Sequence, residues 1–249
     1  MRGLFGYHVM IISKYLETIK DFINLELVCK KFRENMEKFH FNPIPLNIKT
    51  LGYFPNIETL HLWDVKDETF GNGFMTNTEE KVDNENKTVL NRKFFRIIVW
   101  FNVNFETVDR NKNRNIEFKN VTYTENDRKK FGNIIPSSVK SIGNFCFGHC
   151  NKLSSIIIPL SVTSIGGYCF SWCSSLTSVT IPSSVTLIGH SCFYKCSSLR
   201  SVTIPSSVTS IGYDCFCECT SLSSVTIPLS VTSISGCCFP SNTIIHRSE

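Results

Sequence analysis

The feature that most constrains this chain is a spacing of 23 residues between five prolines in its second half. These are Pro136, Pro159, Pro182, Pro205 and Pro228, and the sequence between them nearly repeats, as in IPSSVTLIGHSCFYKCSSLRSVT. A unit of this size cannot bury a core of its own, so the copies must stack and each must cover the next. The spacing therefore predicts a solenoid, which offers long binding surfaces rather than a catalytic cleft.

One half of each unit has the pattern of a strand. When the proline is counted as position 1, Leu199, Val202 and Ile204 of the third unit occupy positions 18, 21 and 23, and the run alternates at its end. This alternation is typical of a strand with one buried face. We expect the strands of successive units to form a parallel sheet, each ended by a proline that has no N–H for the ladder.

The other half of the unit has a helical pattern. Ile188, Cys192, Phe193 and Cys196 follow each other at the spacing of one helical stripe, after the glycine of position 8. A short helical or 3-10 turn is therefore expected between the strands. The fold class predicted for the chain is an α/β repeat with a parallel sheet of short strands, preceded by a small all-α cap.

The consensus IPSSVTSIGxxCFxxCSSLxSVTIP resembles the BspA-type leucine-rich repeat over residues 136–245. The family commonly has alanine at position 11, where this chain has Cys146, Cys169, Cys192, Cys215 and Cys238. The resemblance implies a curved leucine-rich-repeat solenoid that acts in adhesion or protein–protein contact and has no enzymatic activity of its own. On this reading the regular repeats are the domain 136–249.

The chain has twelve cysteines, and the repeat pairs eight of them as Cys-x-x-x-Cys: 146/150, 169/173, 192/196 and 215/219. Such pairs from neighbouring coils could bind zinc or oxidise into ladders. Core packing is the favoured interpretation, because both positions face the core and a buried free cysteine behaves as a small apolar residue. We therefore assign no metal and no cofactor. Cys217 and Cys237 lie off the repeat pattern and are expected to be the exposed thiols.

Charge and composition exclude other classes. Residues 136–249 hold five of the 26 Lys and Arg residues and three of the 21 Asp and Glu residues, too few cations for nucleic-acid binding. No apolar run is long enough to span a membrane, and MRGLFGYHVMII lacks the cleavage site of a signal peptide. We expect a cytoplasmic protein, with surface association as the alternative.

Residues 8–40 have apolar residues at helical spacing and predict two or three short amphipathic helices. The segment resembles an F-box, on the residues Tyr15, Leu16, Phe22, Leu25 and Val28-Cys29-Lys30-Lys31-Phe32. The resemblance implies that Tyr15, Leu16, Leu25, Val28 and Phe32 bind the adaptor of a ubiquitin ligase. The alternative is that residues 1–44 are a helical cap that shields the first coil from water.

Residues 45–135 predict irregular leading coils. Ile57, Leu60 and Leu62 form one degenerate strand unit, and the runs 94–108 and 115–124 predict two further strands. Between the first strand unit and the run 94–108 the composition is polar and charged, so a mobile loop is expected near residues 75–90.

Positions 9, 10, 13 and 14 differ between the copies, whereas the outward strand positions are mostly Ser and Thr. Because Tyr, Trp and Arg are enriched at interface hot spots, we take the variable ridge and one nearby arginine as the candidate partner-binding residues. They are Phe145, His149, Tyr168, Trp172, His190, Tyr194, Arg200, Tyr213 and Glu218.

No catalytic constellation is recognisable, since the array offers many serines but no matched histidine and carboxylate. The leading hypothesis is a non-enzymatic protein-interaction module. A substrate adaptor of a ubiquitin ligase is the rival, and an adhesive surface protein is the third option. The chain ends before the strand of its fifth unit is expected to be complete, which makes the C-terminal edge a candidate for self-association.

Overall fold

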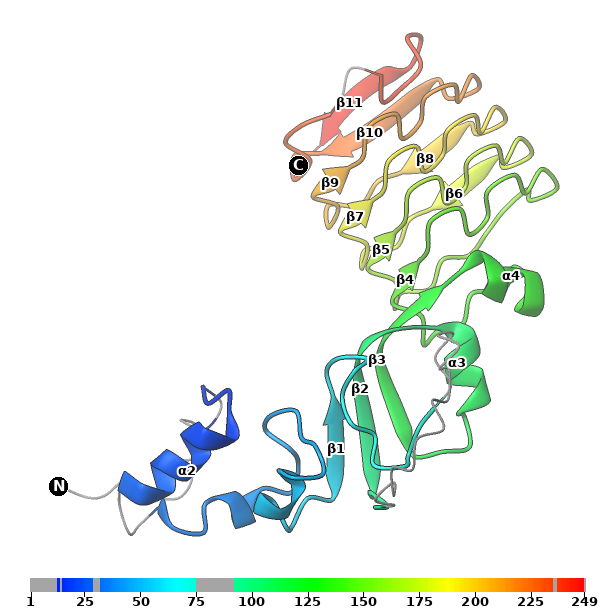
Figure 1. Ribbon diagram of the computed structural model, residues 1–249. Coiled ribbons are helices and arrows are strands. Elements are labelled where there is room, and N and C mark those ends of the chain that lie inside the picture. The colour runs from blue at the N-terminus through cyan, green and yellow to red at the C-terminus, as the bar shows by residue number, and fades with distance from the viewer. Residues whose placement is uncertain (1–12, 14, 29–31, 75–91, 235–236, 249) are drawn as a thin grey trace. The chain divides into compact units, whose positions relative to one another are not determined.

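The computed structural model describes residues 13, 15–28, 32–74, 92–234 and 237–248 (Figure 1). It divides into two compact units: residues 1–102 with 107–119, and residues 103–106 with 120–249. The boundary runs within β2 (Arg96–Asn104), α3 (Phe105–Arg110) and β3 (Ile116–Tyr123). The domain boundaries expected from the sequence lie after residues 44 and 135, where the composition changes. The two units of the structure are instead groups of residues that contact each other.

The first unit contains the helix α2 (Ile19–Val28), the 3-10 helices η2 (Met36–Lys38) and η3 (Leu51–Tyr53), and β1 (Thr59–Leu62). Phe22, on the buried face of α2, meets Phe39 and Phe54 edge to face, with centroids 5.7 and 5.4 Å away. Such pairs stabilise beyond the area they bury. The strand β1 pairs in parallel with β2, and β1, β2 and β3 lie within the predicted strand runs 57–62, 94–108 and 115–124. Residues 105–108 of the second run are helical instead, as part of α3. The mobile loop expected near 75–90 lies outside the described residues.

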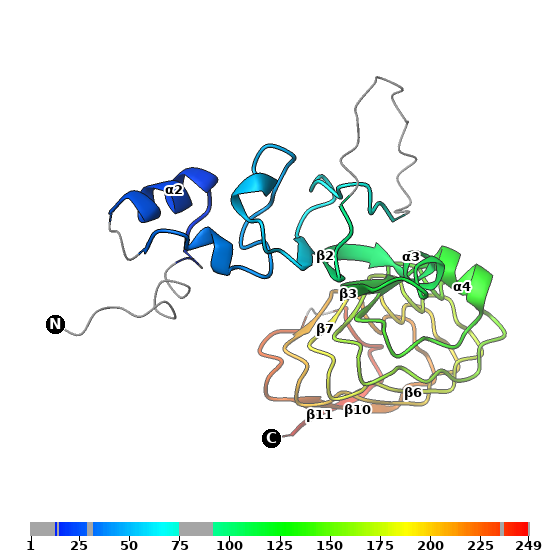
Figure 2. The same ribbon diagram turned by 90° about the horizontal axis from the view of Figure 1, so that it is seen from below.

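The second unit is a stack of coils with strands in two rows, which confirms the predicted parallel-sheet solenoid (Figures 1 and 2). The row formed by positions 20 to 22 was expected from the sequence, and its members pair in parallel in the order β11-β10-β8-β6. They are β6 (Ser178–Thr180), β8 (Ser201–Thr203), β10 (Ser224–Pro228) and β11 (Ile244–Ser248). The strand β11 joins this row from positions 17 to 21 of the last coil. The other row, at positions 6 and 7, has the order β4-β5-β7-β9. Its members are β4 (Ser141–Ile142), β5 (Ser164–Ile165), β7 (Leu187–Ile188) and β9 (Ser210–Ile211).

The core between the two rows is a column of phenylalanine rings. Phe147, Phe170, Phe193, Phe216 and Phe239 stack with centroids 5.1–5.2 Å apart. The column starts on Tyr123 of β3, which is fully buried and donates its hydroxyl to the Gly132 carbonyl at 2.8 Å. The core therefore runs the length of the array and begins before the first repeat proline.

The first regular coil is covered by β3 and α4 (Glu125–Phe131). The strand β3 pairs with β4, and Arg128 of α4 donates Nε–H to the Cys146 carbonyl at 2.5 Å. Thr124 and Asp127 form a capping box at the N-terminus of α4. Asp127 also accepts backbone N–H groups of Phe105 and Glu106, at 3.3 and 2.8 Å. This buried carboxylate thus ties α4 to the first residues of α3, while Arg128 joins α4 to the first coil.

The end of the array corrects one expectation. All five residues of β11 pair with β10, so the strand of the last coil is complete. Arg247 occupies the register position opposite the buried Ile227 and donates to the carbonyls of Val231 at 2.7 Å and Pro228 at 3.5 Å. A charged side chain on the inward face of an edge strand opposes the stacking of another strand.

Candidate functional site

The segment at positions 8 to 15 forms consecutive turns of the 3-10 type, one of the two forms expected, and no α-helix in the described coils. Its bonds between residues three apart are of the 3-10 type, as from the Gly148 N–H to the Phe145 carbonyl at 2.9 Å. However, the N–H groups of positions 10, 12 and 14 donate to the next coil at 2.7–3.0 Å. Trp172, for example, donates to the Tyr194 carbonyl at 2.7 Å. Since alternate donors leave the coil, no continuous helix can form.

This backbone arrangement sets the direction of the side chains at positions 10 and 14. Both positions have positive φ in four consecutive coils, between 49° and 61°. The residues are Phe145, His149, Tyr168, Trp172, Ser191, Lys195, Asp214 and Glu218. Left-handed backbone is costly for residues with a Cβ, and here the inter-coil hydrogen bonds hold the backbone in this conformation.

The coils approach each other closely at position 8. A Cβ on Gly189 would lie 2.4 Å from the Gly167 nitrogen, and one on Gly212 would lie 2.3 Å from the His190 nitrogen. Glycine is therefore required by contact between backbones, since neither residue has positive φ. This contact brings the side chains at positions 9 and 10 of successive coils to stacking distance.

These side chains form the first aromatic ladder: Phe145, Tyr168, His190 and Tyr213. Phe145 stacks on Tyr168 at 4.8 Å, Tyr168 meets His190 edge to face at 4.9 Å, and His190 stacks on Tyr213 at 5.1 Å. The ladder crosses from position 10 to position 9 between the second and third coils, where Ser191 is buried instead.

Positions 13 and 14 form the second ladder: His149, Trp172, Tyr194, Lys195 and Glu218. The rings of His149 and Trp172 stack at 5.8 Å, and Trp172 meets Tyr194 edge to face at 6.2 Å. The Lys195 ammonium lies 4.2 Å from the centre of the Trp172 ring. Glu218 accepts the Tyr194 hydroxyl at 3.1 Å and lies 3.5 Å from Lys195 Nζ.

Solvent meets the edges of the ladder rings, because neighbouring rings cover much of their faces. Tyr213 is 57% exposed, Phe145 50% and Trp172 44%, whereas Tyr168 and Tyr194 are half-buried. The two ladders thus offer a strip of ring edges, hydroxyls and one ion pair. The structure brings together eight of the nine sequence-predicted candidates. Arg200 is exposed at position 19, outside both ladders.

The paired cysteines of the repeat face inward as free thiols, and apart from the half-buried Cys150 all of them are buried. The thiols of position 15 tie coils together: Cys173, Cys196 and Cys219 donate to the position-12 carbonyl of the preceding coil at 3.0–3.1 Å. Burial raises the pKa of the Cys173 thiol to about 12 and that of Cys192 well above its ordinary value. Protonated, inaccessible thiols pack and donate but do not react. Outside the repeat pattern, Cys237 is exposed and Cys217 is half-buried.

The described residues include no group of three or more His, Cys, Asp or Glu placed to hold a metal ion. No helix in the described ranges is long and apolar enough to cross a membrane.

The candidate adaptor-binding residues of the first unit are spread around α2. Tyr15 is 81% exposed and Val28 77% exposed, while Leu16, Leu25 and Phe32 are half-buried. These five side chains do not form one buried cluster, and α2 anchors itself through Phe22 instead.

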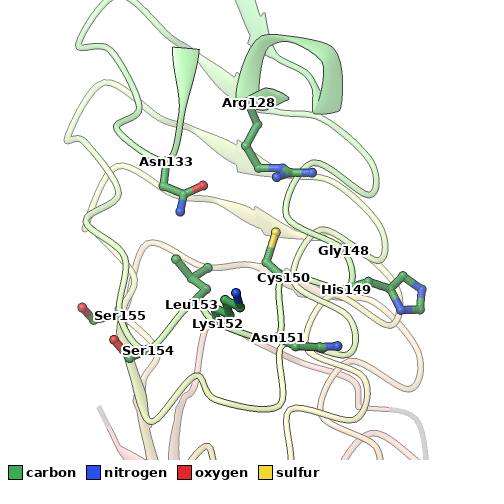
Figure 3. A pocket seen from close by; sticks show the side chains of 10 residues that line it. All are labelled: Arg128, Asn133, Gly148, His149, Cys150, Asn151, Lys152, Leu153, Ser154 and Ser155. Carbon is green, nitrogen blue, oxygen red and sulfur yellow. The ribbon is translucent and has the colours of Figure 1, made fainter. Parts of the chain in front are cut away.

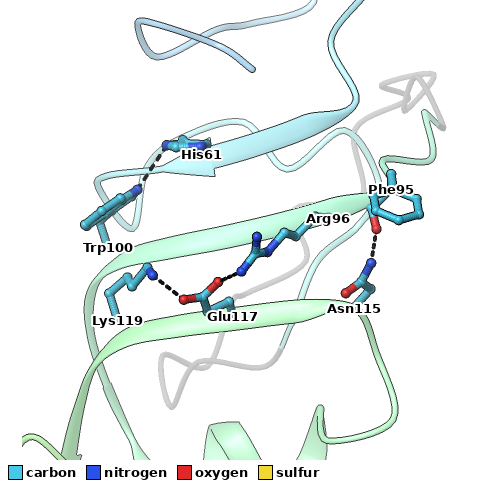
Figure 4. A network of polar contacts seen from close by, with 7 residues as sticks. All are labelled: His61, Phe95, Arg96, Trp100, Asn115, Glu117 and Lys119. Atoms are coloured by element: carbon cyan, nitrogen blue, oxygen red, sulfur yellow. Dashed lines mark hydrogen bonds and ion pairs between the residues drawn. The ribbon is translucent and has the colours of Figure 1, made fainter. Parts of the chain in front are cut away.

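Sequence reasoning missed a second aromatic group, on one face of β1, β2 and β3 (Figure 4). Trp100 of β2 donates Nε1–H to His61 Nδ1 at 3.2 Å, and Glu117 of β3 pairs with both Arg96 and Lys119. Burial, together with the Lys119 and Arg96 charges, lowers the pKa of His61. The available signal was the period of two that places Arg96 with Trp100, and Glu117 with Lys119, on one strand face.

Solved structures similar to the chain include the following three, all at low identity. A leucine-rich repeat protein of T. pallidum aligns with 19% identity over 52% of this chain and 80% of its own, at a TM-score of 0.34. A leucine-rich cell surface protein of Faecalibacterium prausnitzii aligns with 22% identity over 54% and 53%, at 0.33. A leucine-rich repeat protein of Bacteroides ovatus aligns with 16% identity over 79% and 55%, at 0.25. No curated protein matches the chain significantly.

The comparison with protein families agrees with the geometry. Residues 125–246 match the model described as "BspA type Leucine rich repeat region", in six copies. This range takes in α4 as well as the regular coils, in line with the role of α4 in covering the first of them. Residues 125–246 are therefore a BspA-type leucine-rich repeat region, and this repeat family suggests a protein-interaction or surface module.

Proposed function

We propose that this chain is a non-enzymatic protein-interaction module and that the two aromatic ladders bind its partner. The observation that carries the proposal is the continuity of the ladders. Positions that differ between the copies nevertheless supply rings that contact each other from Phe145 to Tyr213 and from His149 to Tyr194.

Pre-ordered rings suit binding because they lose little conformational entropy when a partner arrives. Trp172 is held by His149, Tyr194 and Lys195, so its side chain is already fixed in the free protein. The opposite candidate, the outward face of β6, β8 and β10, carries only Ser and Thr at its exposed positions. Small hydroxyl side chains supply few hot spots.

The test uses affinity purification from the native cell with the full chain as bait. Trp172→Ala and Tyr213→Ala should each weaken partner recovery at least tenfold, since a hot spot contributes about 2 kcal/mol or more. Thr180→Ala and Thr203→Ala, on the hydroxyl face, are the matched controls and should leave recovery unchanged. Equal recovery with both pairs of variants, all folded by circular dichroism, would contradict the proposal.

A second candidate function is that of an F-box-type substrate adaptor, in which the first unit holds the ligase and the array holds the substrate. The exposure of three apolar side chains, Tyr15, Leu27 and Val28, favours it, because a docking surface needs accessible apolar residues. Binding to the purified ligase adaptor should be lost when Leu16 and Val28 are changed to alanine. It should be kept in Asn24→Ala, on the same helix as Val28. Failure of the unaltered chain to bind the adaptor would end this candidate.

We place the module in the cytoplasm, and an adhesive role at the cell surface is the third candidate. Biotin labelling of intact cells separates the two, since only a surface protein is labelled without lysis. Strong labelling would replace the cytoplasmic assignment with the adhesive one.

A further inference from the structure

The first regular coil leaves one strand edge unpaired. Its residues 154–157 lie beside β6, through the bridge between Ile157 and Thr180 and the bond from the Thr177 N–H to the Ser154 carbonyl at 3.1 Å. In the other row, β4 is flanked by β3 as well as by β5. In this row, no described strand pairs with residues 154–157 on the edge that faces away from β6. Unpaired edges recruit extended chains because their N–H and C=O groups seek partners.

A basic cavity of about 660 Å³ lies beside this edge (Figure 3). It is lined by Arg128, Asn133 and residues 148–155, with Arg128, His149 and Lys152 among them and no acidic side chain. The Arg128 guanidinium donates to the Cys146 carbonyl. The Glu125 carboxylate lies 4.0 Å from Arg128 and closer to Lys129, at 2.7 Å. The cavity therefore favours a negatively charged group.

The sequence of this coil also departs from the repeat at the edge. Ile157 stands at position 22, where the next three coils have threonine, and it is 87% exposed. Leu160, three residues on, is 75% exposed. Apolar side chains along an open strand edge are the usual specificity contacts of strand addition.

We propose that this edge binds an extended, carboxylate-bearing segment of a partner protein, which adds as a further strand beside residues 154–157. A peptide fits better than a nucleic acid because only a peptide supplies the backbone N–H and C=O groups that a strand edge pairs with. A second copy of this chain fits poorly. Its strand at the far end of the sheet, β11, has the sequence IIHRS, with Arg247 and no carboxylate to meet a basic cavity.

The test measures fluorescence anisotropy of labelled peptides of about six residues, the usual strand length, with the full chain. A peptide that alternates valine with glutamate should bind. Two control peptides should bind at least tenfold more weakly. They are a peptide that alternates valine with lysine and a backbone N-methylated version of the valine–glutamate peptide. Lys152→Glu should weaken the first peptide about tenfold, which corresponds to ~1.4 kcal/mol. Lys140→Glu, an exposed lysine outside the cavity, is the matched control.

Hydrogen exchange locates the site independently: the amides of residues 154–158 should become protected when the valine–glutamate peptide binds. Tyr213→Ala should leave this binding unchanged, so failure here is distinguishable from failure of the ladder proposal. The inference is overturned by absent protection at 154–158, by equal binding of the N-methylated peptide, or by an oligonucleotide that binds more tightly than the peptide. Self-association of the chain that Lys152→Glu abolishes would also overturn it, in favour of a second copy.

Discussion

The phenylalanine column makes a quantitative prediction about how the array is held together. Phe193 is fully buried and has a ring on each face, Phe170 at 5.2 Å and Phe216 at 5.1 Å. Truncating a buried Phe to Ala costs about 3–5 kcal/mol, and each lost aromatic pair adds about 0.5–1.5 kcal/mol. We expect Phe193→Ala to cost about 5 kcal/mol. Phe239 is half-buried with one stacking partner, so Phe239→Ala should cost about half as much.

The assay is guanidinium unfolding of the full chain, followed by far-ultraviolet circular dichroism and by tryptophan fluorescence. Two probes are needed because repeat arrays can unfold in segments. Cys192→Ala, at the adjacent buried position, is the control and should cost about 1 kcal/mol, the average for a substitution. The reasoning fails if Phe193→Ala and Phe239→Ala cost the same, or if Cys192→Ala costs more than either.

Four further predictions follow from contacts between coils and at the ends of the array. Gly189→Ala should destabilise the array strongly, because its added Cβ would meet backbone atoms. Gly167→Ala should have a mild effect on thermal unfolding, because the atoms nearest to its added Cβ belong to the His190 ring, which can move. Burial raises the pKa of Cys173 to about 12 from its ordinary value near 9, so the folded chain holds this proton more tightly than the unfolded chain. Stability should therefore be full below pH 9 and fall between pH 9 and 12, measured by urea unfolding against pH. Asp127→Ala should cost about 2 kcal/mol, since it removes a capping box and two further N–H acceptor contacts; unchanged urea unfolding would contradict this. Arg247→Val should promote concentration-dependent association in sedimentation, because it removes the inward charge from the edge strand β11.

The sequence predicted the stacking and the strands at positions 20 to 22, because alternation over Leu199, Val202 and Ile204 is long enough to recognise. It did not predict β4, β5, β7 and β9, since a two-residue strand such as Ser164–Ile165 shows no alternation. The segment at positions 8 to 15 was expected to be a helical or 3-10 turn, and the sequence did not decide between them for a related reason. Its inward residues have helical spacing, but the destination of each N–H depends on the neighbouring coil, and a period within one coil does not reveal that.

The ladders, too, were predictable from the sequence only in part. That positions 9, 10, 13 and 14 vary was visible in the sequence, but the contacts among their side chains were not. His190 and Tyr168 occupy different positions of the repeat and still meet at 4.9 Å, because the coils close together at the position-8 glycines. The helix α4 was also missed, although Thr124-x-x-Asp127 is the spacing of a capping box. Its significance depends on the buried contacts of Asp127, which only the fold supplies.

The backbone of the ladders bears on whether their residues vary freely. Left-handed backbone costs roughly 1–2 kcal/mol for a residue with a Cβ, and Gly or Asn relieve that cost. A position free of other demands would therefore drift toward Gly or Asn, yet positions 10 and 14 hold Phe145, Tyr168 and Trp172 at φ of 53–61°. Stacking between neighbours returns about 0.5–1.5 kcal/mol per pair, which roughly cancels the cost. Stability alone therefore gives no reason to prefer large rings there, whereas the proposed binding at the ladder surface would supply one.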